Sequence, residues 1–107
     1  MNEPATYDVK IYRNTTWREK FVIEVDEVPI DYLDGPYTAE CELHPNQDGH
    51  VDIQVPVVLG ADGSIVVELD PSETSAIAWE DGSWDIETTD PTGHTERKVQ
   101  GLVTVRD

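Results

Sequence analysis

The sequence is poor in basic residues and in cysteine, and both shortages restrict what the protein can be. It has seven Lys and Arg residues against 23 Asp and Glu residues, which gives a formal net charge of -16. A surface this acidic repels phosphate backbones and anionic lipids, so we expect no direct binding to nucleic acid or membranes. The single cysteine, Cys41, excludes an internal disulfide, and an oxidising compartment is therefore not implied.

Long apolar runs and targeting signals are also missing. No stretch approaches the ~18 apolar residues that a membrane helix needs, and Met1-Asn2-Glu3-Pro4 lacks the basic and apolar regions of a secretory signal. The 107 residues nevertheless include 37% hydrophobic residues, with three Trp, four Tyr and one Phe. A chain of this size buries enough surface for one core, and we expect residues 1–107 to form a single domain.

The excess of acidic residues has three interpretations that composition alone leaves open. Like charges keep neighbouring molecules apart and favour solubility. An acid-rich, Lys-poor surface also suits a host with high internal salt, where cations screen the repulsion between carboxylates. The same surface would also suit docking to a basic partner.

Apolar and polar residues alternate along most of the chain, which is typical of strands with one buried face. Trp17, Phe21, Ile23 and Val25 share one face of their segment, and Val51 begins another such run. Turn residues, chiefly Asp-Gly pairs, separate the segments. Seven segments show this alternation: residues 7–12, 17–25, 37–44, 51–59, 64–69, 83–88 and 95–105. The pattern predicts an all-β, antiparallel β-sandwich.

Three local signals refine this prediction. Asp62-Gly63 lies between two strong strands and predicts a hairpin. Asp70-Pro71-Ser72-Glu73 has the residues of a capping box, with Pro at the first helical position, and predicts one or two helical turns that cross between the sheets. Gly101 predicts a bulge in the last strand that would turn both Val99 and Leu102 inward.

The order of the expected elements follows a known pattern. The residues that carry it are the strand end Ile11-Tyr12-Arg13 with the turn Asn14-Thr15-Thr16, the strand from Trp17 to Val25, the segment Val28-Pro29-Ile30-Asp31-Tyr32-Leu33, the helical turn Leu69-Asp70-Pro71-Ser72-Glu73-Thr74, the strand Gly82-Ser83-Trp84-Asp85-Ile86, and the turn Thr92-Gly93 followed by Gly101-Leu102-Val103-Thr104-Val105. In this order the chain resembles the small immunoglobulin-like domain of tailed-phage structural proteins, and it is similar to the N-terminal domain of the phage baseplate upper protein family.

The resemblance implies both a fold and a role. The fold would be an immunoglobulin-like antiparallel β-sandwich of about seven strands with one short helical turn. The role would be that of a virion structural protein in multiple symmetric copies. Its partners would be the major capsid protein or tail and baseplate proteins.

Residues with possible chemistry lack the spacing that a reactive site requires. His44 and His50 flank a loop that contains Asp48, but no zinc or calcium motif supports a metal there. Cys41 alternates onto the buried face, where a thiol behaves as a small hydrophobic group. The many carboxylates fall mainly at outward positions and turns, where they stay ionised and are poor general acids. We therefore expect no catalytic residue, no metal and no cofactor, and a protein that is not an enzyme.

Contact with a partner is the remaining way for such a domain to act. Trp79 follows the helical turn among acidic residues, where it would either cap the open end of the sandwich or, if exposed, anchor an interface. Tyr32 lies near a strand end, where it would serve packing or contact, and both are candidate interface residues. Val22, Val58 and Val66 are apolar at outward strand positions, which suggests that a partner covers one face.

These observations favour a structural virion protein, either on the capsid surface as a decoration or minor capsid protein, or in the tail or baseplate. The alternative is a host-surface binding module for carbohydrate or protein, which depends on exposed aromatic side chains at Trp79 and Tyr32. An enzyme that uses two carboxylates is the third possibility, and it requires a concave pocket with a buried acid.

We predict that the melting temperature rises when salt is raised from about 0.1 M to about 1 M, because the Debye length falls from ~10 Å to ~3 Å. Weaker repulsion among the acidic residues is the physical reason. Thermal unfolding followed by circular dichroism at each salt concentration measures this effect. A melting temperature that is indifferent to molar salt contradicts the interpretation of the acidity as salt adaptation.

Overall fold

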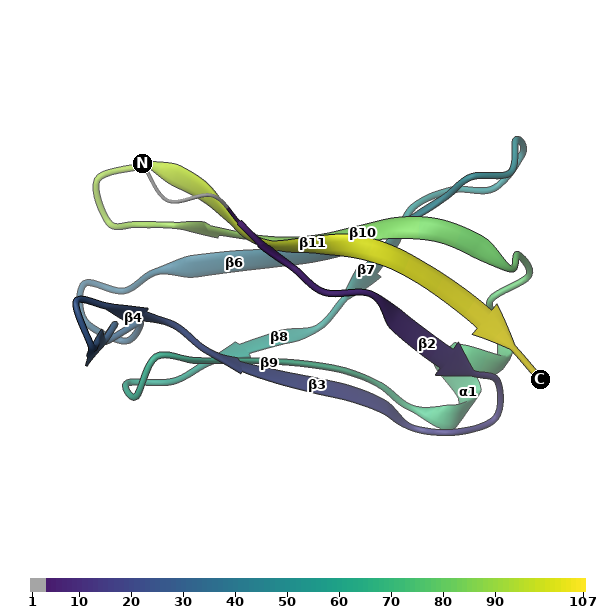
Figure 1. The fold of residues 1–107 in the computed structure, drawn as a ribbon, viewed down its shortest axis with the longest axis horizontal. Helices are drawn as coiled ribbons and strands as arrows, with labels where there is room; N and C mark the ends of the chain where they lie inside the picture. Colours follow the sequence, from purple (N-terminus) through teal and green to yellow (C-terminus); the bar gives the residue numbers. More distant parts are fainter. Residues whose placement is uncertain (1–3) are drawn as a thin grey trace.

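Two stacked β-sheets form the body of the protein, as the computed structural model shows for residues 4–107 (Figure 1). The large sheet has the strand order β1 (Ala5–Thr6), β11 (Thr95–Arg106), β10 (Asp81–Thr89), β6 (Thr38–Pro45) and β7 (Ile53–Val55), and β2 (Val9–Tyr12) also pairs with β11. The small sheet has the order β3 (Trp17–Val22), β9 (Ser64–Leu69) and β8 (Val57–Leu59). A separate hairpin, β4 (Glu24–Val25) and β5 (Val28–Pro29), follows β3. The predicted all-β sandwich is confirmed, while the expectation about a secretory signal concerns residues 1–3, which lie outside the described range.

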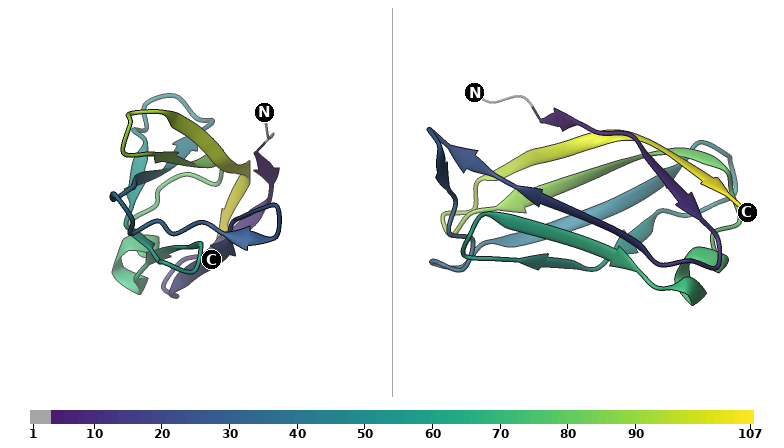
Figure 2. Two further views of the ribbon diagram at one scale, coloured as in Figure 1. Left: turned by 90° about the vertical axis from the view of Figure 1, so that its left-hand side faces the viewer. Right: turned by 60° about the horizontal axis from the view of Figure 1, so that its bottom comes forward.

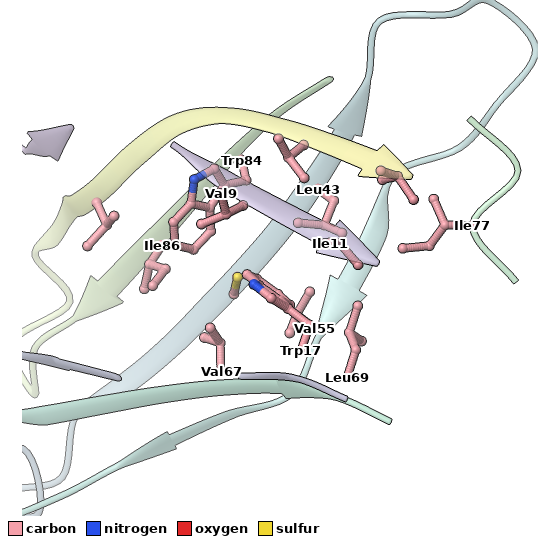
Figure 3. Close-up of a cluster of buried hydrophobic side chains, with 14 of the residues drawn as sticks. Val9, Ile11, Trp17, Leu43, Val55, Val67, Leu69, Ile77, Trp84 and Ile86 are labelled. Carbon is pink, nitrogen blue, oxygen red and sulfur yellow. The ribbon is translucent and has the colours of Figure 1, made fainter. Parts of the chain in front are cut away.

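The core lies between the two sheets and is built from the inward positions that the alternation predicts (Figure 3). Trp84 on β10 and Trp17 on β3 meet edge to face, with ring centroids 5.8 Å apart. Phe21 adds a third ring 5.9 Å from Trp84. Each fully buried large apolar side chain contributes about 1.5–3 kcal/mol to folding, so this aromatic contact between the sheets is a major stabilising feature.

The helix α1 (Pro71–Ser75) begins with the predicted capping box. Asp70 Oδ1 accepts a hydrogen bond from the Glu73 amide at 2.8 Å, and Glu73 Oε1 accepts one from the Asp70 amide at 3.0 Å. The helix ends at Ser75, within the one or two turns that the sequence predicts, and Ile77 is buried in the core two residues later. Figure 2 shows α1 at one end of the sandwich, on the path from the small sheet to the large one. No helix within residues 4–107 is both long and apolar enough to cross a membrane.

Two of the predicted strands are divided in the structure. Residues 51–59 pair with β6 as far as Val55 and with β9 from Val57 onward. Pro56 lies at the change of sheet, and since proline has no amide hydrogen it donates to neither ladder. The expectation that Val51 faces inward is wrong, because this residue precedes β7 in an irregular segment and is 82% exposed. The segment therefore links the two sheets, with β7 at the edge of the large sheet and β8 at the edge of the small sheet.

The other divided strand is residues 17–25. Asp26 and Glu27 both have positive φ values, 52° and 67°, which suits a tight hairpin turn of the mirror-image type. The chain reverses there, so β4 pairs with β5 and leaves the small sheet. The expectation that Val25 faces the core is wrong: the residue lies in this hairpin and is about half exposed.

The last strand contains a bulge, but Gly101 does not form it. The pairing with β10 shifts by one residue between Arg97 and Val99, so the additional residue is Lys98. Val99 is buried as expected, but Leu102 is 61% exposed, and the expectation that it faces inward is wrong. Gly101 is inward-facing and lies where the N-terminal segment, which runs beside β11, comes closest to it.

The close approach of the N-terminal segment explains why position 101 requires glycine. A Cβ at Gly101 would lie 2.1 Å from the carbonyl oxygen of Tyr7, far inside van der Waals contact. This carbonyl oxygen accepts a hydrogen bond of 2.7 Å from Trp84 Nε1. The missing side chain therefore lets the N-terminal segment reach the central tryptophan.

We predict that Gly101→Ala lowers the free energy of unfolding by about 1–3 kcal/mol, because the added methyl group displaces Tyr7 from Trp84. Urea unfolding followed by tryptophan fluorescence measures the change. Leu102→Ala at the exposed neighbouring position is the control and should change the free energy of unfolding by less than about 0.5 kcal/mol. Equal stability of Gly101→Ala and the unmodified chain would show that the close approach is unimportant.

Candidate functional site

The two aromatic residues expected at an interface are part of the core. Trp79 is 2% exposed and Tyr32 is fully buried, so both serve packing, and their selection as candidate interface residues is wrong. Arg13 holds the extended segment before β10 by donating from Nε to the Ile77 carbonyl and from Nη2 to the Trp79 carbonyl, at 2.8 and 2.9 Å. Tyr32 packs edge to face against Tyr37, with ring centroids 5.1 Å apart. Strand alternation does not extend to these irregular segments, and their burial depends on how they fold over the ends of the sandwich.

The outward valines lie where the sequence places them, on the outer face of the small sheet. Val22 and Val58 are 53% and 67% exposed, while Val66 is partly buried between its neighbours. Val66 pairs directly with Val58 on one side and with Lys20 on the other. We call Val22, Val58 and Val66 the valine surface, and it is a small uncharged area on a strongly acidic molecule.

A chain of charged side chains crosses the outer face of the large sheet. His44 Nε2 lies 2.8 Å from Asp85 Oδ2, and His44 Nδ1 lies 3.0 Å from Asp52 Oδ2. Arg97 Nη2 lies 3.8 Å from Asp85 Oδ2 and 3.5 Å from Glu87 Oε2. These five residues form what we call the His44 network, and they cover Asp85 so well that its side chain is only 12% exposed.

Two opposing effects act on the His44 imidazole. Burial alone favours the neutral ring, but hydrogen bonds and charges from Asp85 and Asp52 together outweigh it and raise the pKa of His44 above its ordinary value. No local motif in the sequence indicates this network, because Asp52 and Asp85 lie 8 and 41 residues from His44 along the chain. The available signal was an outward Asp85 in the middle of a strand between two buried residues, since such a carboxylate usually has a partner.

The other residues considered for chemistry remain apart. Asp48 and His50 lie in the connection between β6 and β7, which stands out from the large sheet (Figure 1). Cys41 is fully buried, and desolvation raises the pKa of its thiol to about 12. A thiol that stays protonated and inaccessible does not act as a nucleophile.

Beside His44, Glu42 brings a third metal-ligating side chain. One possible ligand atom from each of Glu42, His44 and Asp52 lies within 4.8 Å of the others. Gln54 Nε2 donates to Glu42 Oε2 at 2.9 Å and holds that carboxylate in place. The described residues thus offer a nitrogen ligand and two oxygen ligands at one point of the sheet.

The two stacked sheets, with β1 and β2 parallel to β11 and a strand that changes sheets, define an immunoglobulin-like β-sandwich. A crystal structure of the titin M3 domain is similar, with a TM-score of 0.52 over 97% of this chain and 92% of that chain. Sequence identity with it is 9%, so the likeness shows the fold alone. No family model and no curated protein matches the sequence.

We predict that Trp79→Ala lowers the free energy of unfolding by about 3–5 kcal/mol, because it leaves a cavity where the indole fills the end of the core. Urea unfolding measures this loss. Val22→Ala on the valine surface is the control and should change the free energy of unfolding by less than about 0.5 kcal/mol. If Trp79→Ala is as stable as the unmodified chain, the indole does not fill the core, and Trp79 is again a candidate interface residue.

Proposed function

We propose that the chain is a structural protein of a tailed virus particle, an immunoglobulin-like module on the capsid surface or in the tail or baseplate. Its partners are the other structural proteins of the particle, and it is present in several symmetric copies. The element order shared with the phage domain supports this function. Since one fold serves many functions, the surface has to supply a further argument.

The valine surface is the observation that carries the proposal. Copies of a chain with a net charge of -16 repel one another and repel other acidic proteins. Two half- to two-thirds-exposed valines, with Lys20 beside them, give an area where a neighbouring subunit approaches without that repulsion. Burial of these side chains against a partner is favourable by roughly 25 cal/mol per Å² of apolar area.

The nucleophile and the carboxylates that a catalytic function would need are not available for one in the described residues. Cys41 is inaccessible, and the buried carboxylate Asp85 is engaged by His44 and Arg97. Most other acids in residues 4–107 lie at exposed or half-exposed positions on strands and turns. We therefore include in the proposal that the protein works by contact and not by a reaction.

The alternative function, a host-surface binding module, loses the residues that motivated it. Trp79 and Tyr32 are core residues and present no ring to a carbohydrate. Tyr7 and Tyr12, each about half exposed, are the aromatic side chains that a glycan could still contact. Glycan-array binding that is lost in Tyr12→Ala would support this alternative.

The test of the proposed function is incorporation into particles. We expect the protein in the proteome of purified virions, and we expect Val22→Asp combined with Val58→Asp to be folded but absent from them, because two charges disrupt an apolar contact. Quantitative mass spectrometry of particles produced with each variant measures incorporation, and circular dichroism checks folding.

The matched control is Val51→Asp. Val51 is more exposed than Val22 or Val58 and lies outside the valine surface. This variant should enter particles at the level of the unmodified chain. Absence of the chain from purified virions refutes the proposed function. Normal incorporation of the double variant refutes the assignment of the valine surface as the contact.

A further inference from the structure

Three side chains with metal-ligating atoms converge on the outer face of the large sheet. Glu42 and His44 are two residues apart on β6 and share a face, and Asp52 reaches them from the segment before β7. His44 Nδ1 and Asp52 Oδ2 are 3.0 Å apart. Two ligand atoms bound to one ion at about 2.1 Å lie about 3.4 Å apart at the tetrahedral angle, so these two atoms share an ion after a small outward movement.

We propose that Glu42, His44 and Asp52 bind a divalent transition-metal ion of the Zn²⁺ class, with water completing the coordination. The sequence predicts no metal here, because these residues do not follow a ligand motif along the chain. Their juxtaposition arises from the pairing of β6 with β7. The site is separate from the valine surface, so it does not depend on the proposed function.

Two neighbours that are not ligands hold the ligands in position. Asp85, with its side chain largely buried, faces His44 Nε2 at 2.8 Å and keeps a hydrogen on that nitrogen. His44 Nδ1 faces Asp52 Oδ2 and donates a hydrogen to it in the metal-free protein, so an ion that binds at Nδ1 displaces this proton. Gln54 orients the Glu42 carboxylate in the same way from β7. Carboxylate–imidazole–metal arrangements of this kind raise the basicity of the ligand and fix its ring.

Charge and ligand chemistry select the ion. The carboxylates of Glu42, Asp52 and Asp85 lie near the proposed position of the ion, and the Arg97 guanidinium lies beside Asp85. A divalent cation is therefore attracted to the site. The imidazole nitrogen favours Zn²⁺, Ni²⁺ or Co²⁺ over Ca²⁺ and Mg²⁺, which prefer oxygen ligands.

The chain offers a matched control for these features. His94 Nε2 lies 3.3 Å from Glu96 Oε1, but it has one carboxylate partner and a well-exposed ring. Within residues 4–107 no second group of three metal-ligating side chains meets the same distance limit. Removal of His94 therefore tests whether any surface histidine beside an acid gives the same binding.

The experiment is isothermal titration calorimetry of the full chain, freed of metal by a chelator, with Zn²⁺ alone. We expect one Zn²⁺ per chain, a tenfold or greater loss of affinity in His44→Gln, and unchanged affinity in His94→Gln. Mg²⁺ in large excess should not displace Zn²⁺. Near-ultraviolet circular dichroism from the tryptophan cluster shows that each variant is folded.

Asp85 is a positioning residue, and its test separates metal binding from stability. Asp85→Asn should weaken Zn²⁺ binding by about 10- to 100-fold, as removal of such partners does in other metal sites. In the unmodified chain, nitrogen-15 spectra should show Zn²⁺ on Nδ1 and hydrogen on Nε2 of His44. If the role of Asp85 is purely structural, Asp85→Asn changes the melting temperature, and the nitrogen-15 spectrum of the variant with Zn²⁺ is the same as that of the unmodified chain.

A second measurement needs no variant. Sub-stoichiometric Ni²⁺, which is paramagnetic, should broaden the ring signals of His44 before those of His50 and His94. Equal broadening of all three histidines overturns the proposal, as does Zn²⁺ affinity that is the same in His44→Gln and the unmodified chain. Displacement of Zn²⁺ by Mg²⁺ also overturns it, because the site would then be a nonspecific acidic surface.

Discussion

The Trp84 indole is the contact on which the rest of the structure depends. It packs against Trp17 and so joins the large sheet to the small one. Its Nε1 donates to the Tyr7 carbonyl and so fixes the N-terminal segment where that segment passes over Gly101. One side chain therefore sets both the spacing of the sheets and the path of the strands that pair with β11. A change at either partner is felt in both places, because close-packed interiors transmit displacements.

Because the residues of the core are buried, a partner contacts the outer faces of the sheets. The small sheet presents valines with Lys20 at their side, and the large sheet presents a network of charged side chains around His44. The first face suits burial against another protein subunit, and the second suits a cation. The two proposals thus use opposite sides of one sandwich and opposite kinds of chemistry.

Local signals in the sequence predicted the regular elements well. Period-two alternation located the strands, the Asp70 and Glu73 pair located the start of α1, and Asp62-Gly63 located the hairpin between β8 and β9. Each signal acts over a few residues and needs no distant partner. The errors fall where a distant partner decides. Leu102 faces outward because the pairing of β11 with β10 places the additional residue at Lys98 and continues without a break from Val99 through Leu102.

The sequence by itself determined that the chain forms strands with one apolar face, that these strands stack as a sandwich, and that its surface is acidic. Tertiary structure decided which irregular residues are buried, as for Trp79 and Tyr32, and which polar residues meet. His44 finds Asp52 and Asp85 because β6 lies between β7 and β10. The physical reason is that alternation specifies the face on which a side chain lies, whereas its neighbours on that face depend on the order and register of strands from elsewhere in the chain.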